Sequence, residues 1–335
     1  MIQHSDSNPN PAAPNPAANP NPTSVPNPAG NPKSGTGADF VRLVPELPPV
    51  GRSIRLLIDS DTANEVDDQY AIALALLSPE RFRIEGFVAT HFGDSGGPRG
   101  TDRSYDEILA LLDAAGMAGR FPVKKGGDPL LYSSCPQESE GADFIIERAM
   151  AGTKDDPLWV VGLGAATNIA SAYLKEPRIA ERVVVLWHGR TGGWPKTAWN
   201  FNIYNDLRAV RVIFTSTLPF VLFDTGTDLT CPMEECRQKI RPCGKLGQFL
   251  HDIRLRKAHF QSESKGMFDL GDIAWMIDPS LCTVEEADAP WLDWNMAYKW
   301  DRTYGRLVRV MTVDRDGTFG LLERKLAQQF PPAGG

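Results

Sequence analysis

The 335-residue sequence has few cysteines, no long apolar run and no excess of basic charge. Its five cysteines are an odd number, and their spacing fits no zinc pattern, since Cys231 and Cys236 are five residues apart. We expect reduced thiols, with one disulfide near residues 231–243 as the alternative. Runs such as PLWVVGLGAA, from Pro157, fall short of the roughly 20 residues that a membrane span needs, so we expect no membrane contact. A formal net charge of -7 argues against a nucleic-acid binder.

Large side chains are scarce in residues 1–40, which are mostly Pro, Asn, Ala, Gly and Ser. Such a segment cannot offset its ordering entropy, so we predict a disordered tail or linker. It also lacks the apolar stretch of a secretion signal, which favours a cytoplasmic location. An exported form whose signal was removed or is not seen stays open.

From residue 41 to about 330, short β-branched runs alternate with segments of helical periodicity. This alternation predicts one α/β domain with an open, mainly parallel, Rossmann-like sheet and helices on both faces. The chain after Gly226 looks mostly helical, so we predict a helical C-terminal elaboration with one late strand at 307–314. The other predicted strands are 53–61, 83–93, 122–127, 158–164, 182–189 and 218–226, and the main predicted helices are 67–77, 104–116, 141–152, 166–176, 206–216, 245–265, 272–278 and 321–330.

Ligands of open parallel sheets bind beyond the carboxyl ends of the strands, and acids gather at one such end. The stretch DSDTANEVDD, residues 59–68, holds five carboxylates within ten positions. So many charges in one crevice must bind protons or a cation, and dense oxygen ligands favour calcium or magnesium. Acids at a helix N-terminus are the simpler explanation for Asp67 alone. An EF-hand loop starting at Asp59 is excluded, because Asn64 and Tyr70 stand where it needs Gly and Glu.

Five further motifs follow in order: EGFVATHFGD, PVKKGGDPLL, GLGAATNIASAY, WNFNIYNDLRAV and MFDLGDIAWMIDP. Together with the opening D-x-D and D-D, they resemble the inosine-uridine preferring nucleoside hydrolase family. The family patterns include T-x-x-G-N, G-P-L-T-N-I-A, A-E-F-N-I-x-x-D and M-H-D-P-L-A-V-A-Y-L-I-D-P. This chain resembles a divergent branch, because five residues, TANEV, separate its D-x-D from its D-D where the family usually has three.

The resemblance implies calcium-dependent hydrolysis of the N-glycosidic bond of a ribonucleoside or related N-riboside. Asp61 would act as general base toward the attacking water and also bind the metal, and Asp67 would accept a ribose hydroxyl. Asn202, and with it Asn200 and Asp94, would orient the sugar. The implied metal ligands are Asp59, Asp61, Asp68, Thr167 through its carbonyl, and Asp269, with Asp272 as a competitor of Asp269.

Three departures from the family put the substrate in question. Phe268 replaces the His that protonates the leaving base in some members, Asn200 replaces a Glu, and Asp94 replaces an Asn. We predict His91 as the replacement acid; His188, His251 and His259 are the other candidates. Trp194 is the predicted base-stacking residue, ahead of Trp187 and Trp199. No role follows for Glu65.

Two other functions remain open: a ribose- or nucleoside-binding protein with weak or lost catalysis, and a haloacid-dehalogenase-like phosphohydrolase. The second rests on D-x-D after a strand and on the later GDIAWMID, but Ala63 stands where its first motif needs Thr or Val. The expected partner is a small nucleoside or N-riboside. The family resemblance also implies a homo-oligomer, either a dimer or a tetramer.

Overall fold

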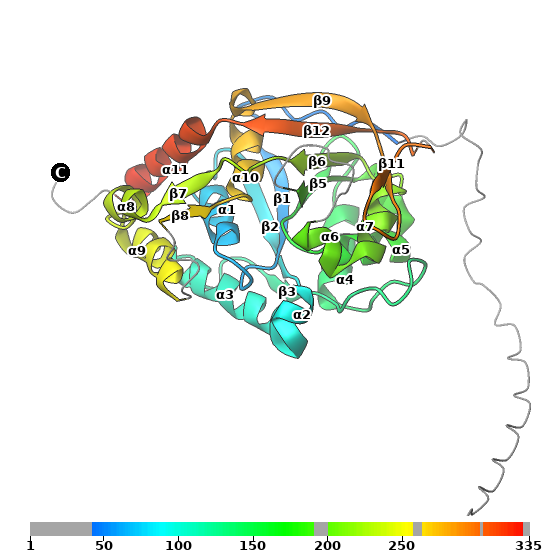
Figure 1. The fold of residues 1–335 in the computed structure, drawn as a ribbon, viewed down its shortest axis with the longest axis horizontal. Coiled ribbons are helices and arrows are strands. Elements are labelled where there is room, and N and C mark those ends of the chain that lie inside the picture. Colours follow the sequence, from blue (N-terminus) through cyan, green and yellow to red (C-terminus); the bar gives the residue numbers. More distant parts are fainter. Residues whose placement is uncertain (1–41, 191–199, 257–262, 302–303, 331–335) are drawn as a thin grey trace, which may run out of the picture. The chain divides into compact units, whose positions relative to one another are not determined.

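The computed structural model describes residues 42–190, 200–256, 263–301 and 304–330. Its centre is an eight-stranded sheet in the order β3-β2-β1-β4-β5-β6-β12-β9 (Figure 1). All neighbours run parallel except β12 and β9, so the predicted open, mainly parallel α/β sheet is confirmed. The strands are β1 Ile54–Ser60, β2 Phe82–Ala89, β3 Val123–Lys125, β4 Leu158–Gly162, β5 Val183–Arg190, β6 Phe220–Asp224, β9 Cys282–Asp288 and β12 Arg306–Val313.

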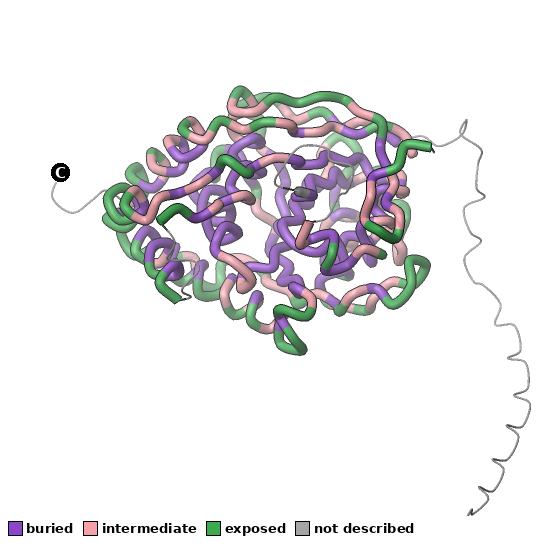
Figure 2. The backbone as a smooth tube through the Cα atoms, in the orientation of Figure 1, coloured by how far each residue is buried: buried purple, intermediate pink, exposed green. Residues whose placement is uncertain are grey.

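Strand β1 lies inside the sheet, and packed side chains cover both of its faces. Leu56 and Ile58 pack into the core on one face, and Leu57 packs into a second core on the other. Every residue of β1 is buried. Both cores appear as the purple interior in Figure 2.

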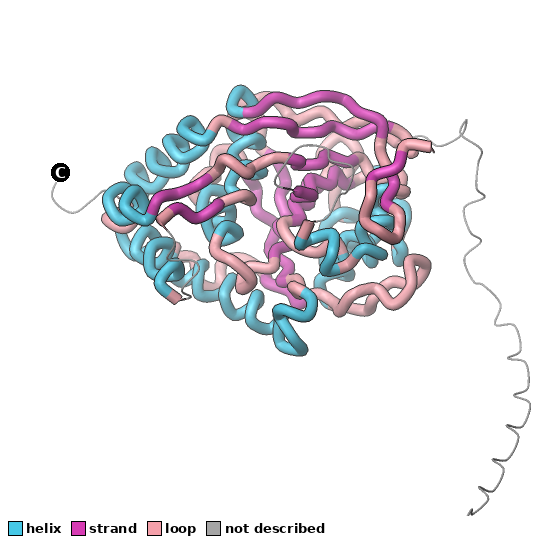
Figure 3. The backbone as a smooth tube through the Cα atoms, viewed as in Figure 1, coloured by secondary structure: helices cyan, strands magenta, loops and turns pink. Residues whose placement is uncertain are grey.

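Helices cover both faces of the sheet (Figure 3). Helices α1, α3, α9, α10 and α11 contribute to the first core, whereas α4, α5 and α7 contribute to the second. All ten residues of α1 are buried, as expected of a helix enclosed between a sheet and other helices. The helices are α1 Asp67–Leu76, α2 Gly93–Gly96, α3 Gly100–Ala114, α4 Glu140–Met150, α5 Thr167–Lys175, α6 Phe201–Asn205, α7 Leu207–Phe214, α8 Met233–Glu235, α9 Gly244–Asp252, α10 Leu270–Ile277 and α11 Arg315–Gln329.

The part of the chain after Gly226 contains more strand than predicted. β9 is an antiparallel edge strand beside β12. Its residues are mostly exposed and polar and show no alternation of buried and exposed positions, so the sequence pattern did not predict it. Two small pairs add to it: β7 Thr230–Pro232 with β8 Ser264–Gly266, and β10 Trp291–Leu292 with β11 Tyr298–Lys299.

The helix predicted for 245–265 is correct only at its start. Helix α9 ends at Asp252, a short 3-10 turn follows at Ile253–Leu255, and Ser264–Gly266 belong to β8. Backbone pairing of Cys231 with Lys265 prevails over the helical pattern of the sequence here. No described helix is long and apolar enough to cross a membrane.

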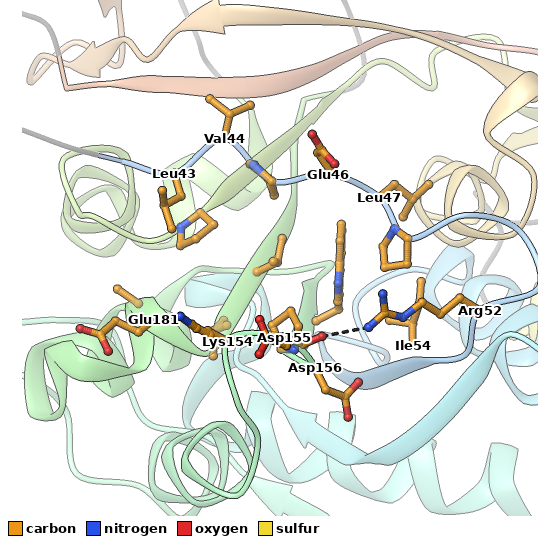
Figure 4. Close-up of a pocket in the computed structure, with 18 of the residues that line it drawn as sticks. Leu43, Val44, Glu46, Leu47, Arg52, Ile54, Lys154, Asp155, Asp156 and Glu181 are labelled. Atoms are coloured by element: carbon orange, nitrogen blue, oxygen red, sulfur yellow. Dashed lines mark hydrogen bonds between the residues drawn. The ribbon is translucent and has the colours of Figure 1, made fainter.

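A pocket of about 340 Å³ lies at the amino-terminal ends of β1, β4 and β5 (Figure 4). The extended segment 43–49 forms one wall, and the loop at 154–157 forms another. Arg52 donates to the Asp155 carbonyl oxygen at 2.9 Å, the dashed bond in the figure. This pocket is at the edge of the sheet opposite the acid cluster, and its mixed lining brings no catalytic set together.

Candidate active site

The acids that the sequence singled out converge at the carboxyl end of β1. Asp59 belongs to β1, Asp61 follows it, Asp67 and Asp68 open α1, and Asp269 precedes α10. All five are buried. Carboxylate oxygens of Asp67, Asp68 and Asp269 lie within 4.8 Å of one another, although about 200 residues separate the first two from the third.

Burial makes the carboxyl groups of Asp59, Asp61, Asp68 and Asp269 hard to ionise, and repulsion by neighbouring acids adds to this for the last three. Burial raises the pKa of Asp59 to about 7, although a hydrogen bond from Asn168 opposes the shift. Burial, then the charge of Asp67, raises the pKa of Asp68 to about 8. Burial and the neighbouring acids also raise the pKa values of Asp61 and Asp269 well above the usual range. A bound cation would reverse these costs, because it favours the ionised forms.

Two of the buried oxygens fit the binding of a cation directly. Asp59 Oδ2 and Asp61 Oδ2 have no hydrogen-bond partner in the described part of the chain. Buried carboxylate oxygens without donors are costly unless a proton or a metal ion satisfies them. Their hard-oxygen chemistry suits calcium or magnesium better than a soft transition metal.

Neighbouring polar residues hold the acids in place. Ser60 Oγ donates to Asp68 Oδ1 at 2.6 Å. Asn168 Nδ2 donates to Asp59 Oδ1 at 3.0 Å, and Asn168 Oδ1 accepts from the Gly127 amide at 2.9 Å. Sequence reasoning gave neither Ser60 nor Asn168 a role, although Asn168 lies inside the quoted T-N-I-A motif.

Gly164, at the end of β4, leaves room for Asp61. A Cβ atom at Gly164 would lie 2.9 Å from Asp61 Cγ and 2.7 Å from Thr90 Cγ2. The glycine is needed here for close approach, because any side chain would displace the acid.

A second cluster joins the end of β5 to α10. His188 Nδ1 lies 2.7 Å from Asp272 Oδ2 and 3.5 Å from Asp269 Oδ1. Burial disfavours the charged imidazole, but Asp272 outweighs it, so the pKa of His188 is raised. Burial raises the pKa of Asp272, and the charge of His188 opposes it. Asp272 is therefore the hydrogen-bond partner that stabilises the charged form of His188. Asp269 lies between this cluster and the acids of α1.

His91, the predicted leaving-group acid, lies in a different chain of contacts. Its Nδ1 accepts from the Gly93 amide at 3.2 Å, so its Nε2 carries the proton and donates to Thr167 Oγ1 at 2.7 Å. Thr167 Oγ1 donates in turn to Asp206 Oδ2 at 2.6 Å. Burial lowers the pKa of His91. Both ring nitrogens of His91 therefore have a hydrogen-bond partner, and its contact with Thr167 helps to position the start of α5. The role of His91 as the leaving-group acid stays a prediction.

The predicted sugar-binding residues differ in placement. Asn202 is buried, and its Nδ2 donates to the carbonyl oxygens of Leu163 and His188, at the ends of β4 and β5. Asn200 Oδ1 caps α6 by accepting from the Asn202 amide at 2.8 Å. Asp94 is exposed in α2.

The aromatic candidates and remaining histidines are only partly within the described residues. Trp187 is a core residue, because it is fully buried in β5 and its Nε1 donates to the Gly164 carbonyl oxygen at 2.9 Å. His251 is buried in α9, and its Nδ1 lies 2.7 Å from Asp252 Oδ1. Trp194, Trp199 and His259 lie outside the described residues.

The structure gives Glu65, from the longer loop, a partner. Lys265 Nζ of β8 donates to Glu65 Oε2 at 2.6 Å and to the Gly266 carbonyl oxygen at 2.6 Å. Lys265 is buried, with 8% of its surface exposed. Burial disfavours its charge, but Asp67 and Glu65 outweigh that effect and raise its pKa.

A mainly parallel α/β sheet with buried acids at its strand ends places the chain in the Rossmann-like α/β class, with a candidate cation site. The family described as inosine-uridine preferring nucleoside hydrolase matches residues 56–325, and the chain belongs to this family. The predicted family and the predicted enzyme class are thereby confirmed.

Curated relatives agree with this assignment. The chain is 27% identical over 259 residues to a non-specific ribonucleoside hydrolase, RihC, of Salmonella enteritidis, covering 70% of this chain and 81% of that one. It is 29% identical over 233 residues to a putative pyrimidine-specific ribonucleoside hydrolase, RihB, of Shigella boydii, covering 62% and 94%.

Solved structures show the same fold. A purine-preferring ribonucleoside hydrolase from Gardnerella vaginalis matches with a TM-score of 0.66 at 21% identity, covering 82% of this chain and 98% of that one. A plant nucleoside hydrolase matches with a TM-score of 0.65 at 20% identity, covering 82% and 99%.

Proposed function

We propose that this protein is a calcium-dependent ribohydrolase that cleaves the N-glycosidic bond of a ribonucleoside or related N-riboside. The observation that carries the proposal is the buried set Asp59, Asp61, Asp67, Asp68 and Asp269 at the strand ends. Family membership supports the reaction class. The products are ribose and the free base.

Asp59, Asp61, Asp68, Asp269 and the Thr167 carbonyl are the proposed calcium ligands. When bound, calcium supplies positive charge that keeps these carboxylates ionised, acidifies a coordinated water and holds vicinal hydroxyls. Magnesium meets the same donors, but the mixed spacing of a strand end, a helix start and a second helix favours the more flexible coordination of calcium.

Asp61 is the proposed general base. It takes a proton from the water that attacks the anomeric carbon, and its carboxylate, buried beside Asp67 and Asp68, faces the positive charge that develops on the sugar. Asp67 accepts a ribose hydroxyl, and Asn202, with Asn200 and Asp94, orients the sugar. His91 is retained as the proposed acid and Trp194 as the proposed stacking residue.

The remaining proposals concern the whole chain. The predicted tail or linker over 1–40 lies outside the described residues. We infer one catalytic domain over 41–330, with a cytoplasmic location and a homo-oligomeric state. Gel filtration with light scattering tests the last of these.

A binding protein with little turnover is the second candidate function. It is favoured by one observation: Asn200 Oδ1 already accepts a hydrogen bond from the Asn202 amide at the start of α6, which weakens it as a ribose acceptor and leaves its Nδ2 to orient the sugar. The family match over 56–325 leaves the phosphohydrolase alternative without support.

The test is base release from a panel of ribonucleosides, followed by chromatography, with Asp61→Asn and Asp68→Asn as variants. We expect each substitution to lower kcat by about 10³-fold, because each removes a charge that the transition state needs. Asp113→Asn, at an exposed acid paired with Lys245, is the matched control and should change nothing. Unaltered activity in Asp61→Asn would refute the site assignment, and ribose binding without base release would favour the binding protein.

A further inference from the structure

The Glu65–Lys265 pair lies beside the acid cluster but has no place in the chemistry described so far. Lys265 Nζ lies 2.6 Å from Glu65 Oε2, and the charges of Asp67 and Asp269 also act on it. A buried ammonium group beside a cluster of buried acids is costly to desolvate, so its presence calls for a use.

The position of Lys265 is set on two sides. Glu65 comes from the loop before α1, and β7 pairs with β8 to fix the backbone of Lys265 opposite Cys231. The Lys265 ammonium lies 5.1 Å from the centroid of the Phe268 ring, and Phe268 directly precedes Asp269. An apolar ring and a cation therefore adjoin the carboxylate on which the proposed sugar site depends.

This corner suits a heterocyclic leaving group. A ring can lie against Phe268 while a ring nitrogen or carbonyl oxygen accepts a hydrogen bond from the ammonium. Phe268 occupies the position at which the family pattern has His, but its ring has no ionisable group. At this corner the negative charge of the departing base must therefore be stabilised by a neighbouring side chain.

We propose that Lys265, held by Glu65, is the catalytic residue that stabilises the departing base. This proposal rests on the proposed function and names the part of the substrate that Lys265 recognises: a nitrogen heterocycle that leaves with negative charge. Glu65 is a positioning residue, since it acts through Lys265. The two extra residues of the loop then serve to bring Glu65 to the lysine.

The step balances without any further reagent. The bond between C1′ and the base nitrogen breaks, and its electron pair stays on the base, whose negative charge faces the Lys265 ammonium. The water oxygen bonds to C1′ and gives one proton to Asp61. That proton returns to solvent. The departed base takes a proton from His91, the proposed acid, and His91 regains one from solvent, so the sum is one riboside plus one water giving ribose and neutral base.

The alternative is that the ion pair only tethers the loop. The two explanations differ in their dependence on the leaving group, because a tether affects every substrate alike. The 4-nitrophenolate that leaves from 4-nitrophenyl β-D-riboside is a stable anion, so a nearby cation accelerates its departure little. An unactivated base is a poor leaving group, so the same cation accelerates its departure much more.

The experiment compares kcat/KM for a ribonucleoside and for 4-nitrophenyl β-D-riboside in the full-length, calcium-loaded protein. We expect Lys265→Met to lower the ratio of the two values about 100-fold, the effect of losing one charged donor at a transition state. Lys265→Arg should recover most of the ratio, and Glu65→Gln should lower it about 10-fold. Lys125→Met, which breaks the exposed Lys125–Asp102 pair, is the matched control and should leave the ratio unchanged.

An equal loss on both substrates in Lys265→Met, or a ratio within threefold of the wild type, would overturn the proposal. If Lys265→Met fails to fold, the ratio in Glu65→Gln and Lys265→Arg decides in the same way. A wild-type protein that releases neither base nor nitrophenol refutes the proposed function itself, and the role of Lys265 with it.

Discussion

Without its cation, the protein should lose stability as the pH rises through the neutral range. The unfolded chain ionises its aspartates near pH 4, whereas folding raises the pKa of Asp59 to about 7 and that of Asp68 to about 8. Between pH 5 and pH 7 both groups are protonated when folded and ionised when unfolded. Each pH unit then lowers the free energy of unfolding by about 1.4 kcal/mol per group.

Over these two pH units Asp59 and Asp68 together account for a loss of about 5 kcal/mol, which for a domain of this size corresponds to a fall of about 10 °C in Tm. Asp61 and Asp269, whose pKa values are also raised, act in the same direction. Saturating calcium should remove most of the fall, because the cation favours the ionised carboxylates. The measurement is Tm by calorimetry at pH 5, 6 and 7, in EDTA and in calcium.

The variant Asp68→Asn sharpens this test. It removes one titrating group, so the fall in EDTA should be smaller than that of the wild type by the share of Asp68, and the difference between EDTA and calcium should shrink as well. Asp113→Asn, at an exposed ion pair, serves as the control. Equal pH profiles in EDTA and calcium, or a Tm in EDTA that rises from pH 5 to pH 7, would refute the reasoning.

Two further predictions concern residues that support the acids. Gly164→Ala should lower kcat at least 100-fold while the fold persists, because the added Cβ would lie 2.9 Å from Asp61 Cγ. Steady-state kinetics measures kcat and circular dichroism checks the fold. A kcat equal to that of the wild type would contradict the prediction. Asp272→Asn should lower the free energy of unfolding by about 3 kcal/mol, because the buried His188 loses the carboxylate that lies 2.7 Å from its Nδ1. Urea unfolding measures this free energy. A loss below about 1 kcal/mol would show that the pair is dispensable.

The positions of the first strands along the sequence, and of the helices between them, could be predicted because each buried element leaves a strong pattern. β1 is buried along its whole length and carries the apolar run Leu56–Ile58, and α1 continues from Tyr70 as an unbroken apolar run to Leu76, so both are plain in the sequence. β9 could not be found in this way, since an exposed polar edge strand has no periodicity that distinguishes it from a loop.

The part of the candidate site whose residues lie close together in the sequence could be predicted. The part whose residues meet only after folding could not. Five acids within ten positions can be read directly, but the contact of Lys265 with Glu65, 200 residues apart, cannot. The same holds for His188 and Asp272. Their sequence neighbourhoods carry no charge pattern that links them, and only the approach of α10 to the end of β5 brings them together.

The most direct test of the central claim is release of reducing sugar from ribonucleosides by protein stripped with EDTA and then reloaded with calcium. We expect no release from the stripped protein, full recovery on adding calcium, and no recovery in Asp61→Asn. Undiminished release after stripping would contradict the cation site. Absence of release from every nucleoside in the calcium-loaded protein would contradict the ribohydrolase.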